Sequence, residues 1–176
     1  PVKVGVMGVG ALGYDVLEKL DFMGFEVAGL GFTAKENFKF PYYTKEQLNE
    51  FLQEVNVVVC LLPLTKDTEN IIDKDFFKSC QKCTYLINVA RGKHLVEEDL
   101  IKAIDEGYIS GALLDVYRKE PLPKNHMFWD QEKITITPHI ASVTNPKAAV
   151  PQILENFSRV KNNHELLNAV DREKGY

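Results

Sequence analysis

Three glycines near the start of the chain have the spacing of a phosphate-binding turn. Gly8, Gly10 and Gly13 follow an apolar, strand-like run (residues 2–7) and precede a segment of helical periodicity. In such a turn the first glycine permits a tight bend, the second lets the backbone approach a pyrophosphate, and the third lets the helix pack closely on the strand. The N–H groups at the helix N-terminus then face the phosphates. The spacing predicts a dinucleotide site, although a tight turn without a ligand would also account for the glycines alone.

Short apolar runs alternate with segments of helical periodicity along the chain. This alternation predicts an α/β fold, a Rossmann-type doubly wound parallel sheet with helices on both faces. Strands are expected at residues 2–7, 26–30, 42–43, 55–62, 85–89, 112–116 and 134–137, and helices at about 12–23, 45–53 and 97–106, with a short one capped by Asp73. A last helix is expected after Asn145, either kinked at Pro151 or beginning only there.

Composition excludes several functional classes. The chain has 176 residues, 45% of them hydrophobic and 26% charged, with a net charge of −4, which is typical of a folded globular protein. Basic and acidic residues are intermixed, so neither nucleic acid nor a membrane is an expected partner. No metal-ligand spacing occurs, and no metal is expected. Cys80 and Cys83 form a C-x-x-C pair, which leaves a thiol redox role as a weaker alternative, while Cys60 lies in a predicted core strand.

An ordered set of short motifs runs through the rest of the chain: Leu61-Leu62-Pro63-Leu64-Thr65 with Thr68, Asn88-Val89-Ala90-Arg91-Gly92, Gly111-Ala112-Leu113-Leu114-Asp115-Val116, Glu120-Pro121-Leu122-Pro123 and Thr137-Pro138-His139-Ile140-Ala141. Together these motifs resemble the D-isomer-specific 2-hydroxyacid dehydrogenase family. The Phe128–Trp129 segment and the closing residues 170–176 resemble its glyoxylate/hydroxypyruvate reductase branch. The resemblance implies a cytoplasmic, homodimeric oxidoreductase that transfers hydride from a nicotinamide cofactor to a small 2-keto acid.

Family members carry a further substrate-binding lobe ahead of the glycine turn. We therefore expect residues 1–176 to be a single dinucleotide-binding domain without its N-terminal lobe. Residues from about 144 to 176 would form a C-terminal helix and tail that docks on that lobe.

The resemblance implies that Arg91, Glu120 and His139 form the catalytic set, and the chemistry of the three side chains agrees. Reduction of a 2-keto acid needs a hydride for the carbon, a proton for the carbonyl oxygen and a group that holds the carboxylate. His139 suits proton donation because the ordinary pKa of histidine lies near working pH. Glu120 would orient the imidazole, and the planar fork of Arg91 would bind the carboxylate. A capping histidine and ordinary surface charges are the alternative interpretation.

The end of the second strand predicts which dinucleotide is bound. An NAD site usually places an acid there for the ribose hydroxyls, but residues 30–35 contain none, and Glu36 is the first. Thr33 could donate a hydrogen bond, and Lys35 a charge, to a 2′-phosphate. We therefore expect NADPH to be preferred, with NAD as the alternative.

The resemblance implies further cofactor contacts in addition to the three glycines: Val9, Ala11, Leu12, Leu62, Pro63, Leu64, Thr68, Val89, Ala90 and Asp115. Trp129 is expected either in the core or beside the substrate. His94, His126 and His164 have no supporting neighbours in the sequence and are expected on the surface.

Two alternatives for the function stay open. One is an NAD-linked dehydrogenase acting on another hydroxy acid such as phosphoglycerate. The other is a dinucleotide-binding module without catalysis, which would have no use for the arginine, glutamate and histidine together.

Overall fold

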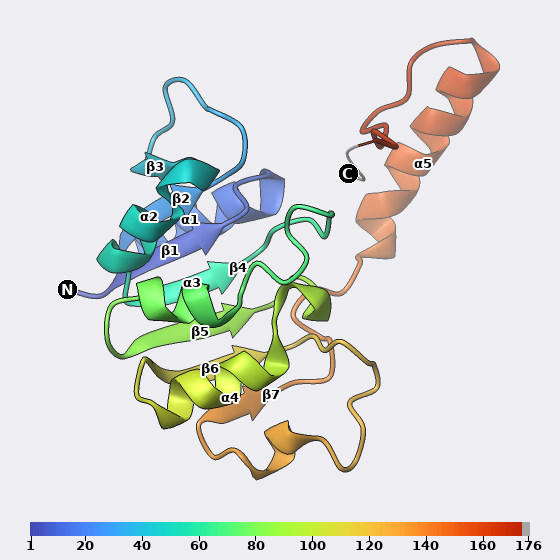
Figure 1. Cartoon of the computed structure of the whole chain (residues 1–176). Coiled ribbons are helices and arrows are strands. Elements are labelled where there is room, and N and C mark those ends of the chain that lie inside the picture. Colours follow the sequence, from blue (N-terminus) through green and yellow to red (C-terminus); the bar gives the residue numbers. More distant parts are fainter. Residues whose placement is uncertain (174–176) are drawn as a thin grey trace. The chain divides into compact units, whose positions relative to one another are not determined.

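A computed structural model describes residues 1–173 of the chain (Figure 1). The chain divides into two compact units, one of residues Pro1–His139 and one that begins at Ile140. The second unit contains the segment expected from residue 144 onward. The last three residues of the reductase-like tail, 174–176, lie outside the described part.

The first unit is built on one seven-stranded sheet in which every paired strand is parallel. The strand order is β3-β2-β1-β4-β5-β6-β7, so the order reverses between β1 and β4. The strands are β1 (Lys3–Met7), β2 (Glu26–Leu30), β3 (Tyr42–Tyr43), β4 (Val57–Cys60), β5 (Thr84–Asn88), β6 (Ile109–Leu114) and β7 (Ile134–Ile136). The predicted Rossmann-type sheet is confirmed. The strand expected at 112–116 differs most, since β6 begins three residues earlier and ends two residues earlier, while β5 lies one residue earlier than expected and β4 is shorter at both ends.

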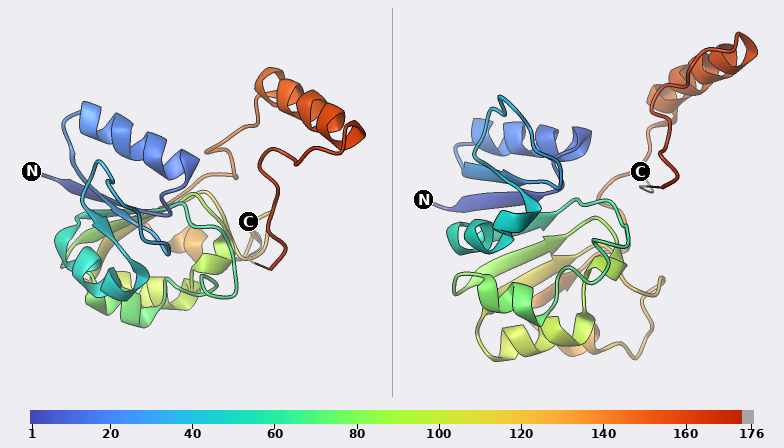
Figure 2. Two further views of the ribbon diagram at one scale, coloured as in Figure 1. Left: turned by 90° about the horizontal axis from the view of Figure 1, so that it is seen from above. Right: turned by 45° about the horizontal axis from the view of Figure 1, so that its top comes forward.

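Helices cover both faces of this sheet (Figure 2). Helix α1 (Ala11–Phe22) lies on one face, and α2 (Leu48–Glu54), α3 (Lys74–Ser79) and α4 (Glu97–Asp105) lie on the other. Three short 3-10 turns complete the unit: η1 (Lys45–Gln47), η2 (Gly92–His94) and η3 (Met127–Asp130).

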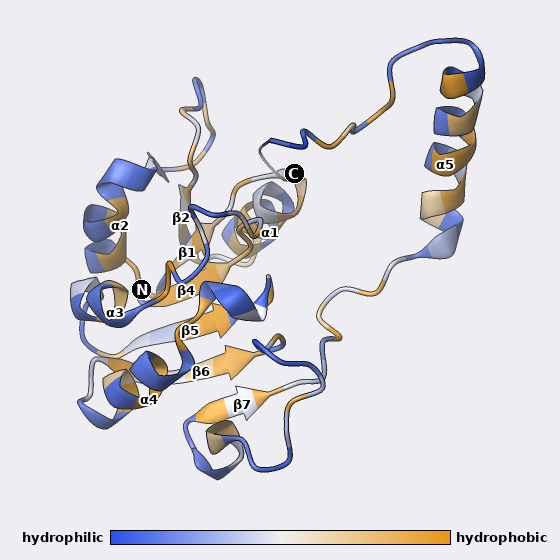
Figure 3. Cartoon of the chain, turned by 45° about the vertical axis from the view of Figure 1, so that its right-hand side comes forward, coloured by the Kyte–Doolittle hydropathy of each residue, from blue (hydrophilic) through white to orange (hydrophobic). Residues whose placement is uncertain are grey.

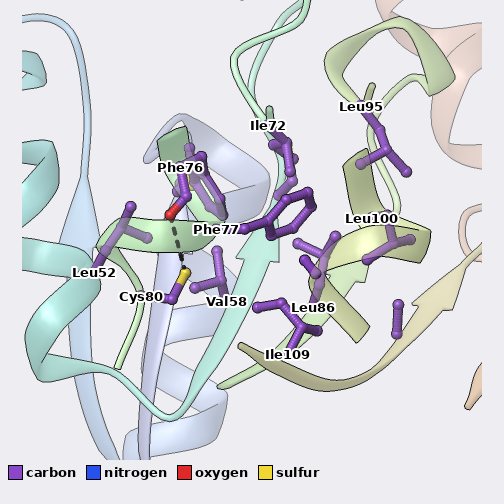
Figure 4. Close-up of a cluster of buried hydrophobic side chains, with 14 of the residues drawn as sticks. Leu52, Val58, Ile72, Phe76, Phe77, Cys80, Leu86, Leu95, Leu100 and Ile109 are labelled. Atoms are coloured by element: carbon purple, nitrogen blue, oxygen red, sulfur yellow. Dashed lines mark hydrogen bonds between the residues drawn. The ribbon is translucent and has the colours of Figure 1, made fainter. Parts of the chain in front are cut away.

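Each face has its own apolar core. The larger one joins the strands to α2, α3 and α4, and Figure 4 shows Phe77 and Leu100 packed over Val58 and Leu86. Full burial of one side chain of this size stabilises the folded state by about 1.5–3 kcal/mol. The sheet that carries the loops at its carboxyl edge is therefore held from both sides.

The helix boundaries follow the capping signals in the sequence. The Asp73 carboxylate accepts hydrogen bonds from the N–H groups of Asp75 and Phe76, both at 3.0 Å. These bonds give partners to two N–H groups in the first turn of α3, which have none within the helix. Gly24 and Gly107 have positive φ just after α1 and α4, the conformation that ends a helix most easily at glycine. The predicted stops are therefore confirmed.

The second unit consists of α5 (Pro146–Lys161) and the segment after it. The Asn145 side chain accepts a hydrogen bond from Lys147 N at 3.0 Å and caps the helix. The expectation of a start at Pro151 is wrong, because an asparagine cap followed by proline at the first position is itself a strong start. Hydrophobic residues recur along the α5 ribbon (Figure 3), and the side chains of Ile153, Leu154, Phe157 and Val160 are each 60–64% exposed.

Among residues 1–173, no helix combines the length and the apolar character needed to cross a bilayer.

Candidate active site

The glycine turn lies at the carboxyl end of β1, beside β4, where the strand order reverses. Ligands of open α/β sheets bind at this kind of crevice. Gly8 has φ +98°, and a Cβ there would lie 2.5 Å from the backbone of Leu61 in the loop after β4. Gly8 is therefore required by the close approach of the two loops.

The other two glycines of the turn have different physical reasons. A Cβ on Gly13 would lie 2.0 Å from the Gly8 carbonyl oxygen, so this position needs glycine for α1 to sit on the turn. Among the described residues other than its chain neighbours, no atom lies within 4 Å of a Cβ built on Gly10. The fold leaves Gly10 open, which fits the approach of a pyrophosphate to the backbone.

The N-terminus of α1 is also suited to an anion. Gly10 is its N-cap, and in the described chain no side chain caps this end and its first turn holds no acidic residue. The N–H groups of the first turn and the positive end of the helix dipole are therefore available to phosphate. The predicted contacts Ala11 and Leu12 lie in this turn and are exposed, whereas Val9 is buried.

The residues expected to select the cofactor lie in the exposed segment after β2. The Lys35 ammonium donates a hydrogen bond to the Val9 carbonyl oxygen at 2.7 Å, so its charge lies against the glycine turn. The Thr33 side chain is exposed, and its carbonyl accepts a hydrogen bond from the Tyr42 hydroxyl at 2.5 Å. The structure thus brings Lys35, from the end of β2, to the loop after β1.

The turn after β4 is organised by Thr68. The Thr68 hydroxyl donates to the Pro63 carbonyl at 2.6 Å and accepts from Thr65 N at 2.8 Å. Thr68 is buried and Leu62 is 5% exposed, whereas Pro63 and Leu64 are half-buried. Thr68 therefore shapes the turn from inside, and its predicted contact with a cofactor stays a prediction.

Asn88 holds the loop that carries Arg91 through two side-chain hydrogen bonds. The sequence did not mark Asn88 as a functional residue. The fully buried Asn88 side chain accepts from Ala90 N at 3.2 Å and donates to the Arg91 carbonyl at 3.1 Å. A Cβ on Gly92 would lie 1.9 Å from Tyr117 in the loop after β6. These contacts bring the exposed Arg91 towards the segment that contains Glu120.

Glu120 and His139 form the central pair of the site. Nδ1 of His139 lies 2.7 Å from Oε2 of Glu120, and Oε1 of Glu120 accepts from Tyr117 N at 3.0 Å. Burial acts to raise the pKa of Glu120. The hydrogen bonds from His139 and Tyr117, together with the charges of His139 and Arg91, nevertheless bring that pKa below its ordinary value. The carboxylate is thus kept ionised beside the imidazole, and Arg91 is close enough to act on it.

Tyr117 links the two loops that carry this pair. Its hydroxyl lies 2.9 Å from the carbonyl oxygen of Leu114, the last residue of β6, and 2.7 Å from that of Thr137, which follows β7. The signal in the sequence was weak, since a tyrosine two residues after Asp115 has no distinctive spacing.

A cavity of about 610 Å³ adjoins the pair. Glu120 and His139 lie on its wall with Leu122, Ile136 and Trp129. Trp129 is 54% exposed and its indole N–H donates to the Pro123 carbonyl at 2.8 Å. Trp129 therefore does not lie in the core but lines the same cavity as Glu120 and His139, and its expected place beside the substrate stays a prediction.

Two of the three remaining histidines are not where the sequence suggested. His94 is completely buried, and His126 is half-buried with Nε2 3.2 Å from a Glu97 carboxylate oxygen. Their partners come from other loops, so local sequence gave no sign of them. His164 is exposed, as expected.

Asp115 and the cysteines complete the set of predicted residues. The buried Asp115 carboxylate accepts a hydrogen bond from the Thr137 hydroxyl at 2.5 Å. Cys60, Cys80 and Cys83 are free thiols. Burial raises the pKa of Cys80 to about 12, which disfavours the thiolate that redox exchange needs. No cluster able to hold a metal occurs in residues 1–173.

The family model for the D-isomer specific 2-hydroxyacid dehydrogenase NAD binding domain matches residues 2–141. The chain belongs to this family. The matched range contains the glycine turn, the Arg91 loop and the Glu120–His139 pair, so residues 2–141 correspond to the NAD binding domain of this family.

Curated relatives place the chain near one branch of that family. It is 43% identical over 174 residues to glyoxylate/hydroxypyruvate reductase A of Photorhabdus laumondii and 38% identical to that of Yersinia enterocolitica. Each alignment covers 98% of this chain and 56% of the relative. The chain thus spans little more than half the length of these relatives.

Solved structures agree with this placement. A D-isomer specific 2-hydroxyacid dehydrogenase from Xanthobacter autotrophicus, in complex with NADPH, matches with a TM-score of 0.95 and 37% identity, covering 99% of this chain and 73% of that chain. An NADPH-dependent glyoxylate/hydroxypyruvate reductase from Sinorhizobium meliloti, in complex with NADP, matches with a TM-score of 0.94 and 34% identity, covering 99% and 57%. The fold is therefore that of 2-hydroxyacid dehydrogenases.

Proposed function

We propose that this chain is the dinucleotide-binding part of an enzyme that reduces a small 2-keto acid, such as glyoxylate or hydroxypyruvate, with NADPH. The observation that carries the proposal is the 2.7 Å contact between Glu120 and His139, at the same edge of the sheet as the glycine turn. A module that only bound dinucleotide would have no use for an oriented imidazole beside an arginine.

His139 acts as the proton donor in this proposal. Its Nδ1 is held by Glu120, which leaves Nε2 as the nitrogen that faces the substrate carbonyl oxygen. The ionised Glu120 stabilises the imidazolium and fixes the orientation of the ring. Arg91 binds the substrate carboxylate through its planar fork. When bound, NADPH supplies the hydride.

The preference for NADPH is carried by the segment after β2. Lys35 is held against the glycine turn by its bond to Val9, and Thr33 is exposed beside it. A cation and a hydroxyl at this position favour a 2′-phosphate over a free ribose hydroxyl. Relatives solved with NADP or NADPH support the same preference.

The remaining expectations concern the whole protein. The exposed apolar side chains of α5 support docking of the C-terminal segment on a part of the protein that the longer relatives carry beyond this match. A homodimer is proposed as well. Three free thiols support a reducing compartment, the cytoplasm.

Calorimetric titration of the chain with NADPH and with NADH tests the cofactor assignment. We expect the tighter binding for NADPH. Equal or tighter binding of NADH would favour an NAD-linked dehydrogenase, and absence of binding to either nucleotide would refute the proposal.

A turnover assay tests the catalytic assignment. NADPH oxidation by the protein is followed at 340 nm with glyoxylate and with hydroxypyruvate. His139→Ala should lose at least about a hundredfold in turnover, the usual contribution of a positioned acid. His164→Ala, which changes an exposed histidine of the other unit, is the matched control. Turnover retained in His139→Ala would refute the role of His139, and NADPH binding without turnover in a longer protein that carries this chain would favour a binding module.

A further inference from the structure

His94 is the one histidine of the first unit whose ring is completely buried. Both of its ring nitrogens face carbonyl oxygens. Nδ1 lies 3.0 Å from the Arg91 oxygen and Nε2 lies 3.2 Å from the Pro63 oxygen. A carbonyl oxygen only accepts hydrogen bonds, and a neutral imidazole carries a single N–H, so a neutral ring donates to one of the two carbonyls and only contacts the other. Because His94 itself belongs to the loop that carries Arg91, an N–H on Nε2 that donates to the Pro63 oxygen joins the two backbone segments.

The two carbonyls belong to loops that follow different strands. Pro63 lies in the turn after β4, and Arg91 lies in the loop after β5. Each carbonyl has a second partner from its own loop, since Thr68 donates to Pro63 and Asn88 donates to Arg91. The Thr68 bond thus lies within the turn after β4, and the Asn88 bond lies within the loop after β5. The His94 ring, in contrast, reaches from the loop after β5 to the turn after β4.

We propose that His94 is a positioning residue that fixes the nucleotide-facing turn at Pro63 relative to the substrate-facing loop at Arg91. The inference rests on the proposed function, because it assigns ligands to these two loops. Backbone hydrogen bonds from Asn70 N to Lys93 O and from Ile72 N to His94 O, both at 2.9 Å, also join the two segments, and the His94 ring adds the contact that reaches the Pro63 turn itself.

The burial of the imidazole argues against a purely space-filling role. A buried polar ring without partners costs free energy that an apolar side chain of similar size would not. Burial lowers the pKa of His94, the two carbonyls act in the opposite direction, and the nearby Arg91 charge lowers it further. The imidazole suits this site because its Nε2–H can donate to the Pro63 carbonyl while the ring fills the buried space.

Three substitutions at His94 separate the effect of the ring contact with Pro63 from that of the ring contact with Arg91. The Gln side chain can place its amide near Nε2, so His94→Gln keeps the donor towards Pro63. The Asn side chain can place its amide near Nδ1, so His94→Asn keeps the donor towards Arg91. His94→Leu keeps apolar volume and neither donor. Thermal unfolding of each chain, compared with wild type, measures the structural cost by itself.

Titration with NADPH then reports on the Pro63 side of the link. We expect His94→Leu and His94→Asn to bind NADPH about tenfold more weakly than wild type, and His94→Gln to stay within about threefold. A purely structural role predicts that affinity follows the melting temperature in all three variants. Affinity that follows stability, or equal affinity in all four chains, would overturn the inference.

A measurement on the wild-type chain covers the case in which the variants do not fold. In a ¹H–¹⁵N spectrum of the imidazole groups, the His94 resonances should shift on saturation with NADPH, because the turn that His94 holds would contact the nucleotide. If the amides of Gly8, Gly10 and Gly13 shift while the His94 ring does not, the inference is overturned and the proposed function stands. If neither the glycine amides nor the His94 ring resonances shift, both the inference about His94 and the proposed function are refuted.

Discussion

Replacement of Gly10 by alanine should separate nucleotide binding from folding. The open space around a Cβ at this position and its ordinary extended backbone, φ −79° and ψ −160°, mean that alanine fits without strain. The substitution should change the free energy of unfolding by no more than about 1 kcal/mol, the usual difference between glycine and alanine at an N-cap. The added methyl group would instead occupy the path by which a pyrophosphate reaches the backbone.

The matched control is Gly13→Ala, three residues away in the same turn. Its Cβ would lie 2.0 Å from the Gly8 carbonyl oxygen, and because that atom is backbone, α1 must move from the sheet. We expect Gly13→Ala to lose about 3 kcal/mol of stability, the upper end of the usual cost of overpacking. The two substitutions add the same atoms, and they should differ in stability: Gly13→Ala is destabilised, whereas Gly10→Ala is not.

Urea unfolding and NADPH calorimetry on both variants measure these effects. Gly10→Ala should keep the wild-type unfolding midpoint and bind NADPH at least tenfold more weakly, a loss of about 1.4 kcal/mol. Wild-type affinity in Gly10→Ala would show that no phosphate approaches this glycine. Destabilisation of Gly10→Ala as large as that of Gly13→Ala would refute the reasoning from open space.

Three further outcomes can be measured with the same preparations. Lys35→Ala should lower the preference for NADPH over NADH several-fold, whereas Lys82→Ala, at the opposite edge of the sheet, should not; an unchanged ratio would remove Lys35 from phosphate binding. Because the pKa of Glu120 is lowered in the folded chain, its stabilisation is present above the ordinary pKa of 4.5 and is lost as pH falls through the lowered value. Glu120→Gln should lack this acid-dependent part in thermal melts, and an identical pH profile would contradict the pairing. Serine at both Cys80 and Cys83 should leave NADPH affinity unchanged, and a large loss would reopen a thiol role.

The elements of the first unit were predictable because their signals are local. The alternation of apolar runs gave the strands, and Asp73, Gly24 and Gly107 gave helix ends within a residue or two. The glycine spacing likewise marked the nucleotide turn before any fold was known. These features depend on the preference of each residue for its own backbone conformation, which a sequence displays directly.

The helix around Pro151 shows where local rules compete. Proline inside a helix removes one hydrogen bond and crowds the preceding turn, which favoured a later start. The asparagine cap and Pro146 at the first helical position were the stronger signals, and α5 runs through Pro151.

The sequence by itself determined the alternating fold, the glycine turn and the candidates Arg91, Glu120 and His139. Only the tertiary structure decided which buried groups hold those candidates: Asn88 beneath Arg91, Tyr117 between the Glu120 and His139 loops, and His94 between two loops that are about thirty residues apart. Such partners meet because parallel strands bring the ends of distant segments to one edge of the sheet. No local pattern in the sequence records these contacts, and so a histidine that was expected on the surface, His94, is completely buried in the turn after β5.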